Sequence, residues 1–219
     1  DSDNYVIPFI GDHITLPNDT EDVKILGIDV KCGTPILDIK NALRKYEIFD
    51  LETSAFTTDS KYHIDLKTIC SEKVVCDRIE YLPTSFKKDS YDYIIIEKCI
   101  NEYPEPINVI KNADSLLKSG GKLFCKLKNT YNINTIFEIM GYDAVEMSNL
   151  IQYRSESFYE ALLQNDINSE LIACNPVKAN KETYEYAVSL VSHSGNSESD
   201  DNIIMTKLMT DDFWFKITK

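Results

Sequence analysis

Residues 28–35, which read IDVKCGTP, have the composition of a turn that holds a nucleotide or a similar polar ligand. An apolar, β-branched run (residues 23–30) precedes this turn, and a helical apolar pattern (residues 35–45) follows it. A strand that turns directly into a helix aims backbone N–H groups and the positive end of the helix dipole at whatever lies above the turn. Such turns usually contain several glycines, so that ligand and backbone can approach closely. Here Gly33 alone remains.

Lys31 is the main departure from a glycine-rich turn. If its position requires a positive φ, a residue other than glycine costs about 1–2 kcal/mol, and the side chain can occupy ligand space. In the alternative, the loop follows another path and Lys31 points outward. Pro35 fits the first turn of the following helix, with Thr34 as its N-cap.

Strands and helices alternate after an irregular leader (residues 1–22). We expect strands at 23–30, 46–52, 73–77, 91–97, 121–128, 169–174 and 184–192, and helices at 35–45, 62–71, 105–118, 132–140 and 154–165. This order predicts an α/β fold with a mainly parallel seven-stranded sheet that is covered on both faces.

The last two expected strands are separated by a short connection, which predicts an antiparallel terminal hairpin at one edge of the sheet. We therefore expect one domain over residues 23–192. Residues 193–219 are expected to form a polar loop and a C-terminal extension of unassigned position.

The amino-acid composition narrows the kinds of molecule that the chain is expected to bind. The 219-residue chain has a formal charge of −13 and a pI near 4.7, which disfavours binding to nucleic acid and favours a neutral or cationic small molecule. No apolar run approaches the ~20 residues that span a bilayer, so no membrane contact is expected. The sequence does not begin with Met, and further domains of a longer chain are one reading of this.

The six cysteines are scattered without CxxC spacing, and the three histidines lie far apart in the sequence. Neither pattern supplies the paired ligands of a metal site, so no metal is expected. Free cysteines in or beside buried strands favour a reducing, cytoplasmic location.

Three segments in the right order resemble the class I S-adenosylmethionine-dependent methyltransferases, over roughly residues 23–192. The first is IDVKCGTP, which is similar to the Asp-x-Gly-x-Gly-x-Gly turn of the family, with Asp29 and Gly33 in register. The second is EIFDLETS, where Glu52 is an acid at about the ~20-residue spacing after the turn at which a ribose is bound. The third is the long segment 90–129, which looks like the fourth strand, acidic loop, helix, Gly-Gly turn and fifth strand of the family.

The resemblance implies a Rossmann-like methyltransferase fold with S-adenosylmethionine above the carboxyl ends of the first three strands. It places Asp29 and the backbone of residues 31–33 near the methionine end, and Glu52 at the ribose hydroxyls. The residues that it implies for cofactor binding are Asp29, Lys31, Cys32, Gly33, Glu52, Asp77, Arg78, Ile79 and Glu97.

In the segment VVCDRIEYLP, the resemblance places Asp77 near the adenine amino group, with Arg78 and Ile79 lining the ring. It places Glu97, together with the two residues after it, beside the methyl group and the substrate. Glu52 is equally well read as a solvated acid at a strand end, and Asp77 as an ordinary loop residue. No catalytic base is assigned.

The leading hypothesis is a methyltransferase that acts on a small molecule, such as a sugar or a natural-product precursor. A degenerate member of the same fold, acting in binding or scaffolding within a larger protein, is the second hypothesis; Lys31 and the low glycine count motivate it. An NAD-dependent oxidoreductase is the third, although the chain lacks the fuller G-x-G-x-x-G fingerprint.

Overall fold

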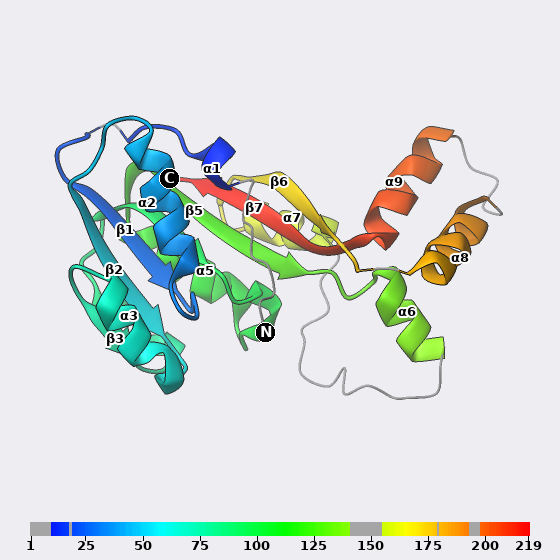
Figure 1. The fold of residues 1–219 in the computed structure, drawn as a ribbon, viewed down its shortest axis with the longest axis horizontal. Helices are drawn as coiled ribbons and strands as arrows, with labels where there is room; N and C mark the ends of the chain where they lie inside the picture. The colour runs from blue at the N-terminus through cyan, green and yellow to red at the C-terminus, as the bar shows by residue number, and fades with distance from the viewer. Residues whose placement is uncertain (1–9, 18, 141–154, 179, 193–197) are drawn as a thin grey trace.

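A seven-stranded sheet forms the centre of the molecule in a computed structural model of the chain, which describes residues 10–17, 19–140, 155–178, 180–192 and 198–219 (Figure 1). The strand order is β3-β2-β1-β4-β5-β7-β6. The strands are β1 (Val23–Ile28), β2 (Leu51–Thr57), β3 (Val74–Cys76), β4 (Tyr91–Ile96), β5 (Leu117–Lys128), β6 (Ser169–Pro176) and β7 (Thr210–Thr218). β1 to β5 pair in parallel, and β7 runs antiparallel to both β5 and β6.

The expected α/β fold, with its mainly parallel sheet and antiparallel terminal hairpin, is confirmed. The helices are α1 (Ile10–His13), α2 (Thr34–Arg44), α3 (His63–Ile69), α4 (Leu82–Ser85), α5 (Pro106–Leu116), α6 (Ile133–Met140), α7 (Ser155–Leu163), α8 (Lys181–Ser192) and α9 (Glu198–Leu208), with short 3-10 helices at Ser60–Tyr62, Ile79–Tyr81 and Ile100–Glu102. Within the described residues, none of these helices has the length and apolarity to span a membrane.

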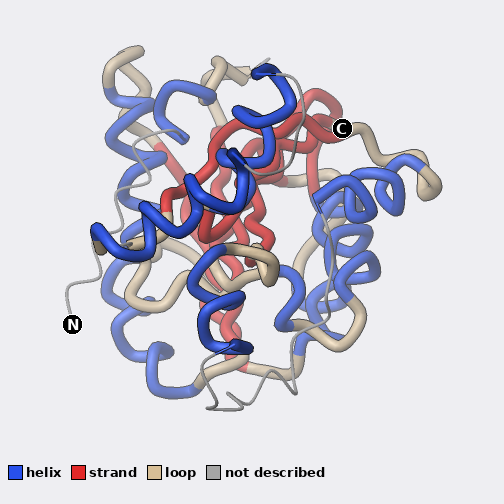
Figure 2. The backbone as a smooth tube through the Cα atoms, turned by 90° about the vertical axis from the view of Figure 1, so that its right-hand side faces the viewer, coloured by secondary structure: helices blue, strands red, loops and turns tan. Residues whose placement is uncertain are grey.

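Helices cover both faces of the sheet, as the view along the molecule shows (Figure 2). Alternate residues of a strand point to opposite faces, and β4 follows this rule: Ile94 and Ile96 pack into one core cluster, and Ile95 packs into the other. The first cluster also contains residues of α5 and α7, and the second contains residues of α2 and α3. Both faces of β4 are thus buried, as its apolar sequence predicts.

The expected strand at 184–192 is wrong, because these residues belong to α8. Tyr184, Val188 and other large residues follow a period of two that is typical of a strand. However, Ala187 and Val191, four residues apart, are the buried pair, which is helical spacing. Asn180 also caps this helix by accepting a hydrogen bond from the backbone N–H of Thr183 at 2.8 Å.

The C-terminal part of the expected extension is instead β7, which lies inside the sheet between β5 and β6. The start of the expected polar loop, at 193–197, lies outside the described residues. Trp214 and Phe215 of β7 are buried in the two core clusters. β6 and β7 form the terminal hairpin, so residues 177–209, with α8 and α9, are an insertion within that hairpin. α8 and α9 project beyond the end of the sheet together with α6 (Figure 1).

The expected strand at 46–52 is also wrong in its bounds, because β2 runs from Leu51 to Thr57. The backbone N–H groups of Tyr46 and Glu47 donate to carbonyls of α2, and Glu47 has a left-handed φ of 62°. These residues therefore terminate the helix and cannot start the next strand. Glu52 consequently lies at the beginning of β2 and not at its end.

Candidate functional site

A cavity of about 340 Å³ lies at the carboxyl ends of β1, β2, β4 and β5. The strand order reverses between β1 and β4, which is where doubly wound sheets bind ligands. The volume lies at the lower end of the range that is usual for small-molecule sites. The residues that line the cavity are Asp29, Lys31, Thr57, Thr58, Asp59, Lys61, Tyr62, Glu97, Lys98, Cys99, Glu102 and Lys126.

The turn after β1 has a left-handed backbone at two residues that are not glycine. Asp29 and Lys31 both have a φ of 47°, and Gly33 has a φ of 85°. The Gly33 N–H donates to the carbonyl of Val30 at 2.7 Å and closes the turn. A lysine in this conformation costs about 1–2 kcal/mol. Lys31 is one of the residues that line the cavity.

Asp29 ties together three segments around the cavity. Its carboxylate accepts hydrogen bonds from the Thr58 backbone N–H at 2.6 Å, from the Thr58 hydroxyl at 3.0 Å and from the Tyr103 hydroxyl at 2.7 Å. Burial, and then the charge of Asp29, raise the pKa of Tyr103 well above its ordinary value, so this hydroxyl stays a donor. The contacts of Asp29 that the structure describes hold the strand ends in place.

Asp59 is the acid that follows β2, and the sequence analysis missed it. Its carboxylate accepts a hydrogen bond from the Lys61 backbone N–H at 3.0 Å and pairs with the Lys61 ammonium at 2.8 Å. The ammonium of Lys61 lowers the pKa of Asp59. The signal was present, since an acid two residues beyond a strand end is a ligand candidate, but the strand had been placed too early in the sequence.

Glu52 lies away from the cavity, and its expected position is wrong. It pairs in register with Lys24 across β1 and β2, and its carboxylate forms an ion pair with the Lys24 ammonium at 2.7 Å. In the same register Ile28, the last residue of β1, lies opposite Phe56. Glu52 is therefore at the amino end of the parallel strands, whereas the cavity is at their carboxyl end.

Glu97 follows β4 directly and is buried against the floor of the cavity, with 3% of its surface exposed. Among the residues that the structure describes, its Oε2 atom has no hydrogen-bond partner. Burial raises the pKa of Glu97, although the positive charges of Lys126 and Lys31 oppose this shift. Burial also raises the pKa of the neighbouring Cys99 thiol to about 12, which disfavours the thiolate form.

Residues 77–79 lie after β3 and outside the lining of the cavity. The Asp77 N–H donates to the carbonyl of Thr57 at 3.1 Å, which places this loop beside the end of β2. The Arg78 guanidinium donates to the Tyr81 hydroxyl at 3.0 Å, and Ile79 packs against the core. Of the residues singled out from the sequence, the cavity brings together Asp29, Lys31 and Glu97.

Cys32 and Gly33 belong to the turn but do not line the cavity. A Cβ atom added to Gly33 would lie 3.0 Å from Cδ1 of Ile69 and 3.3 Å from Cδ2 of Leu66. The remaining glycine of the turn therefore allows close packing against α3 in addition to its left-handed φ.

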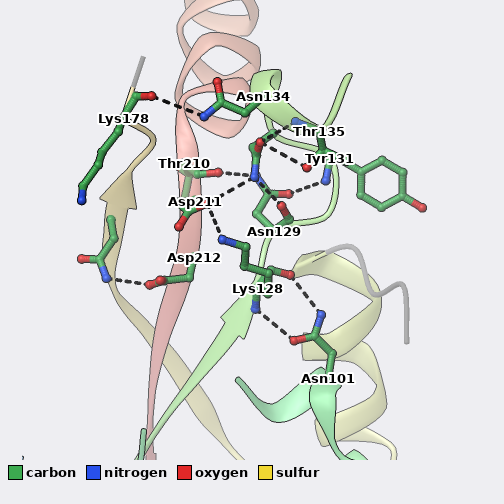
Figure 3. Close-up of polar contacts among 12 residues, drawn as sticks. Asn101, Lys128, Asn129, Tyr131, Asn134, Thr135, Lys178, Thr210, Asp211 and Asp212 are labelled. Carbon is green, nitrogen blue, oxygen red and sulfur yellow. Dashed lines mark hydrogen bonds and ion pairs between the residues drawn. The ribbon is translucent and has the colours of Figure 1, made fainter. Parts of the chain in front are cut away.

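A polar network lies beyond the cavity, where β5 ends and β7 begins (Figure 3). Lys128 forms an ion pair with Asp211 at 2.5 Å, and the Asn129 side-chain amide donates to the carbonyl of Thr210 at 2.7 Å. Asn101 holds the backbone of Lys128 through both its amide oxygen and its amide nitrogen. These contacts fix the end of the insertion that carries α8 and α9, and nothing in the sequence pattern indicated them.

No protein-family model matches the sequence, and no curated protein matches it. Solved structures do match. An S-adenosylmethionine-dependent methyltransferase from Thermotoga maritima superposes with a TM-score of 0.59 and 13% identity, over 97% of this chain and 86% of that one. The YcgJ protein of Bacillus subtilis has a TM-score of 0.57 and 10% identity, over 90% and 92% of the two chains.

Phosphoethanolamine N-methyltransferase 2 of Haemonchus contortus, solved with S-adenosyl-L-methionine, has a TM-score of 0.57 and 15% identity. The match covers 97% of this chain and 51% of that enzyme, so the chain spans about half of its length. Sequence identities of 10%, 13% and 15% to these structures support a shared fold only. The chain has the Rossmann-like fold of the class I S-adenosylmethionine-dependent methyltransferases.

Proposed function

We propose that this chain is an S-adenosylmethionine-dependent methyltransferase-like domain that transfers a methyl group to a small molecule. The observation that carries the proposal is the cavity above β1, β2 and β4, with Asp59 at one side and the buried Glu97 at the other. The similar solved structures that carry the name of such enzymes support it. A sugar or a natural-product precursor is the acceptor class that we favour.

The residues present fit the cofactor. Asp59 has the geometry to accept hydrogen bonds from ribose hydroxyls, because its carboxylate lines the cavity just beyond β2. The buried Glu97 offers an unpartnered carboxylate oxygen to the positively charged sulfonium at the middle of the molecule. Asp77, Arg78 and Ile79 form the neighbouring loop, where adenine is proposed to lie. When bound, S-adenosylmethionine supplies an electrophilic methyl group, and the chain chiefly has to align the acceptor with it.

The cellular location and the kind of acceptor that we propose are supported by the free cysteines and the net charge of the chain. All six cysteines are free, which supports a reducing, cytoplasmic location. The net charge of −13 supports a small acceptor over a nucleic acid.

Isothermal titration calorimetry with S-adenosylhomocysteine tests the proposal. We expect saturable heat, and about tenfold weaker binding in Asp59→Asn, because the lost hydrogen bond is charge-assisted. Asparagine is as good an N-cap as aspartate, so this variant keeps the 3-10 helix that follows. Glu52→Gln removes the same charge at the opposite end of the sheet and should bind like the natural chain. Absence of heat at millimolar ligand in folded protein contradicts the proposal.

A second candidate is a module that keeps the fold but has lost the cofactor and acts in binding or scaffolding. Lys31 favours it, because this side chain lines the cavity from a position with a glycine-like φ of 47°. Lys31→Gly discriminates between the two candidates. Affinity for S-adenosylhomocysteine that arises only in the variant supports the second candidate, and tight binding by the natural chain rejects it.

A further inference from the structure

Glu97 has a buried carboxylate oxygen that no described residue satisfies. The residue is 3% exposed, and Oε2 has no hydrogen-bond partner among the described residues. A buried polar atom without a partner destabilises the folded state, and more so when it is charged. Native structures contain few such atoms, and each calls for an explanation, such as a catalytic role or a bound ion or water.

The unpartnered oxygen belongs to a residue of the cavity lining. Glu97 is anchored from its backbone, since its N–H donates to the carbonyl of Ile28 at 3.3 Å. This bond joins the ends of β4 and β1, the two strands between which the strand order reverses. The carboxyl group is thereby held in the central crevice of the sheet, whereas Asp59 lies on the β2 side.

The cationic side chains nearby do not remove the need for a ligand. Lys126 and Lys31 are close enough to act on Glu97 electrostatically, yet neither donates a hydrogen bond to Oε2. A ligand that brings a positive centre into the crevice would gain the attraction of a buried carboxylate, which is strong where water is excluded. A neutral ligand of the same shape would leave Oε2 without a partner.

We propose that Glu97 is a specificity-determining residue that makes the cavity select a positively charged centre at the middle of an adenosyl ligand over a neutral one. The inference rests on the proposed function and goes beyond it. Its consequence is that the methyl donor, which carries a sulfonium, binds in preference to the demethylated product, which carries a neutral thioether.

Two stable probes that differ in this charge test the inference. S-adenosylhomocysteine is neutral at the central position, and sinefungin carries a protonated amine there; both have the same adenosine and amino-acid ends. Calorimetric titration of the natural chain should show that sinefungin binds tighter by about tenfold or more, because a hydrogen bond to a charged group is involved. In Glu97→Gln this preference should fall to about twofold or less, chiefly through weaker binding of sinefungin.

Two further variants keep the test decisive. Glu97→Asp retains the charge but withdraws it from the crevice, and should show an intermediate preference. Glu52→Gln removes a carboxylate at the other end of the sheet and should retain the full preference. Thermal unfolding of each variant establishes that it is folded.

The titrations distinguish failure of the proposed function from failure of the inference about Glu97. If the natural chain binds neither probe, the proposed function fails and the inference falls with it. If both probes bind and Glu97→Gln weakens them equally, Glu97 faces the amino-acid end or is structural, and the inference alone is overturned. An unchanged preference in Glu97→Gln overturns it as well.

Discussion

The Tyr103 hydroxyl donates a hydrogen bond of 2.7 Å to Oδ2 of Asp29, across 74 positions of the sequence. Both groups are buried, at 2% and 8% exposure. The bond joins the turn after β1 to the segment after β4. It therefore fixes the distance between the two sides of the crevice before any ligand arrives.

Replacing Tyr103→Phe should lower the free energy of unfolding by about 1–3 kcal/mol, because a buried carboxylate loses one of its donors. Urea denaturation of the two proteins measures this difference. Tyr81→Phe is the matched control, since Tyr81 is an exposed tyrosine whose hydroxyl accepts a hydrogen bond from Arg78. The control should change stability by less than about 0.5 kcal/mol, and equal losses in both variants would contradict the role given to Asp29.

Lys31→Gly should stabilise the fold by about 1 kcal/mol, because relief of the left-handed backbone outweighs the entropy cost of glycine. Glu47→Gly provides the comparison: Glu47 has a φ of 62°, is exposed and ends α2 away from the cavity. Thermal or urea unfolding should give similar gains for both variants. Only Lys31→Gly should alter ligand affinity, so a matching change in Glu47→Gly would mean that flexibility, and not cavity space, governs binding.

The stability of the chain should depend on pH through Glu97. Burial raises its pKa above the ordinary value near 4.5, against the charges of Lys126 and Lys31. The folded state thus binds this proton more tightly than the unfolded state, and the stabilisation is present below the unfolded pKa and lost as pH rises through the folded pKa.

Glu97→Gln has no titrating carboxyl group at this position. Its free energy of unfolding, relative to that of the natural chain, should therefore increase as pH rises above 4.5. Urea unfolding of both proteins across this pH range measures the difference in their free energies of unfolding. The contributions of the carboxylates that both proteins share cancel in this difference. A difference that stays constant with pH, or that shrinks as pH rises, would show that folding does not raise the pKa of Glu97.

Phe215→Ala should cost about 3–5 kcal/mol, because β7 is part of the core. Phe215 is 2% exposed and meets the ring of Phe158 edge to face, with centroids 5.1 Å apart. Leu171→Ala, at the position opposite Phe215 in β6 but 49% exposed, should cost less than about 1 kcal/mol. A chain that ends at residue 209 should fail to fold by circular dichroism; a cooperative transition in that protein would mean that β7 is dispensable.

Most of the parallel part of the sheet could be predicted from the sequence, because strands such as β1 and β4 are apolar runs between recognisable turns. β4 and α5 were placed to within a residue or two for this reason. The hairpin partner of β6 was not predictable in the same way. Residues 184–192 and β7 both contain alternating apolar residues, and only the packing of the whole chain selects which of them pairs with β6.

The expected strand boundaries, right or wrong, also determined which residues of the candidate site could be predicted from the sequence. Asp29 and Glu97 were found because each follows a strand whose end the sequence marks clearly. Asp59 was missed and Glu52 was chosen because β2 begins five residues later than expected, after the extra turn that ends α2. The unpartnered oxygen of Glu97 and the Lys128–Asp211 ion pair depend on contacts between distant segments, which no local pattern encodes.

The position of β7 between β5 and β6 has a consequence for biosynthesis. While the ribosome is still adding residues up to 209, β5 presents an unpaired edge, and β6 has not yet met the strand that it borders in the finished sheet. Unpaired edges recruit other chains, and contacts between distant parts of a sequence form slowly. The growing polypeptide therefore remains vulnerable to association through the β5 edge until β7 emerges and covers it.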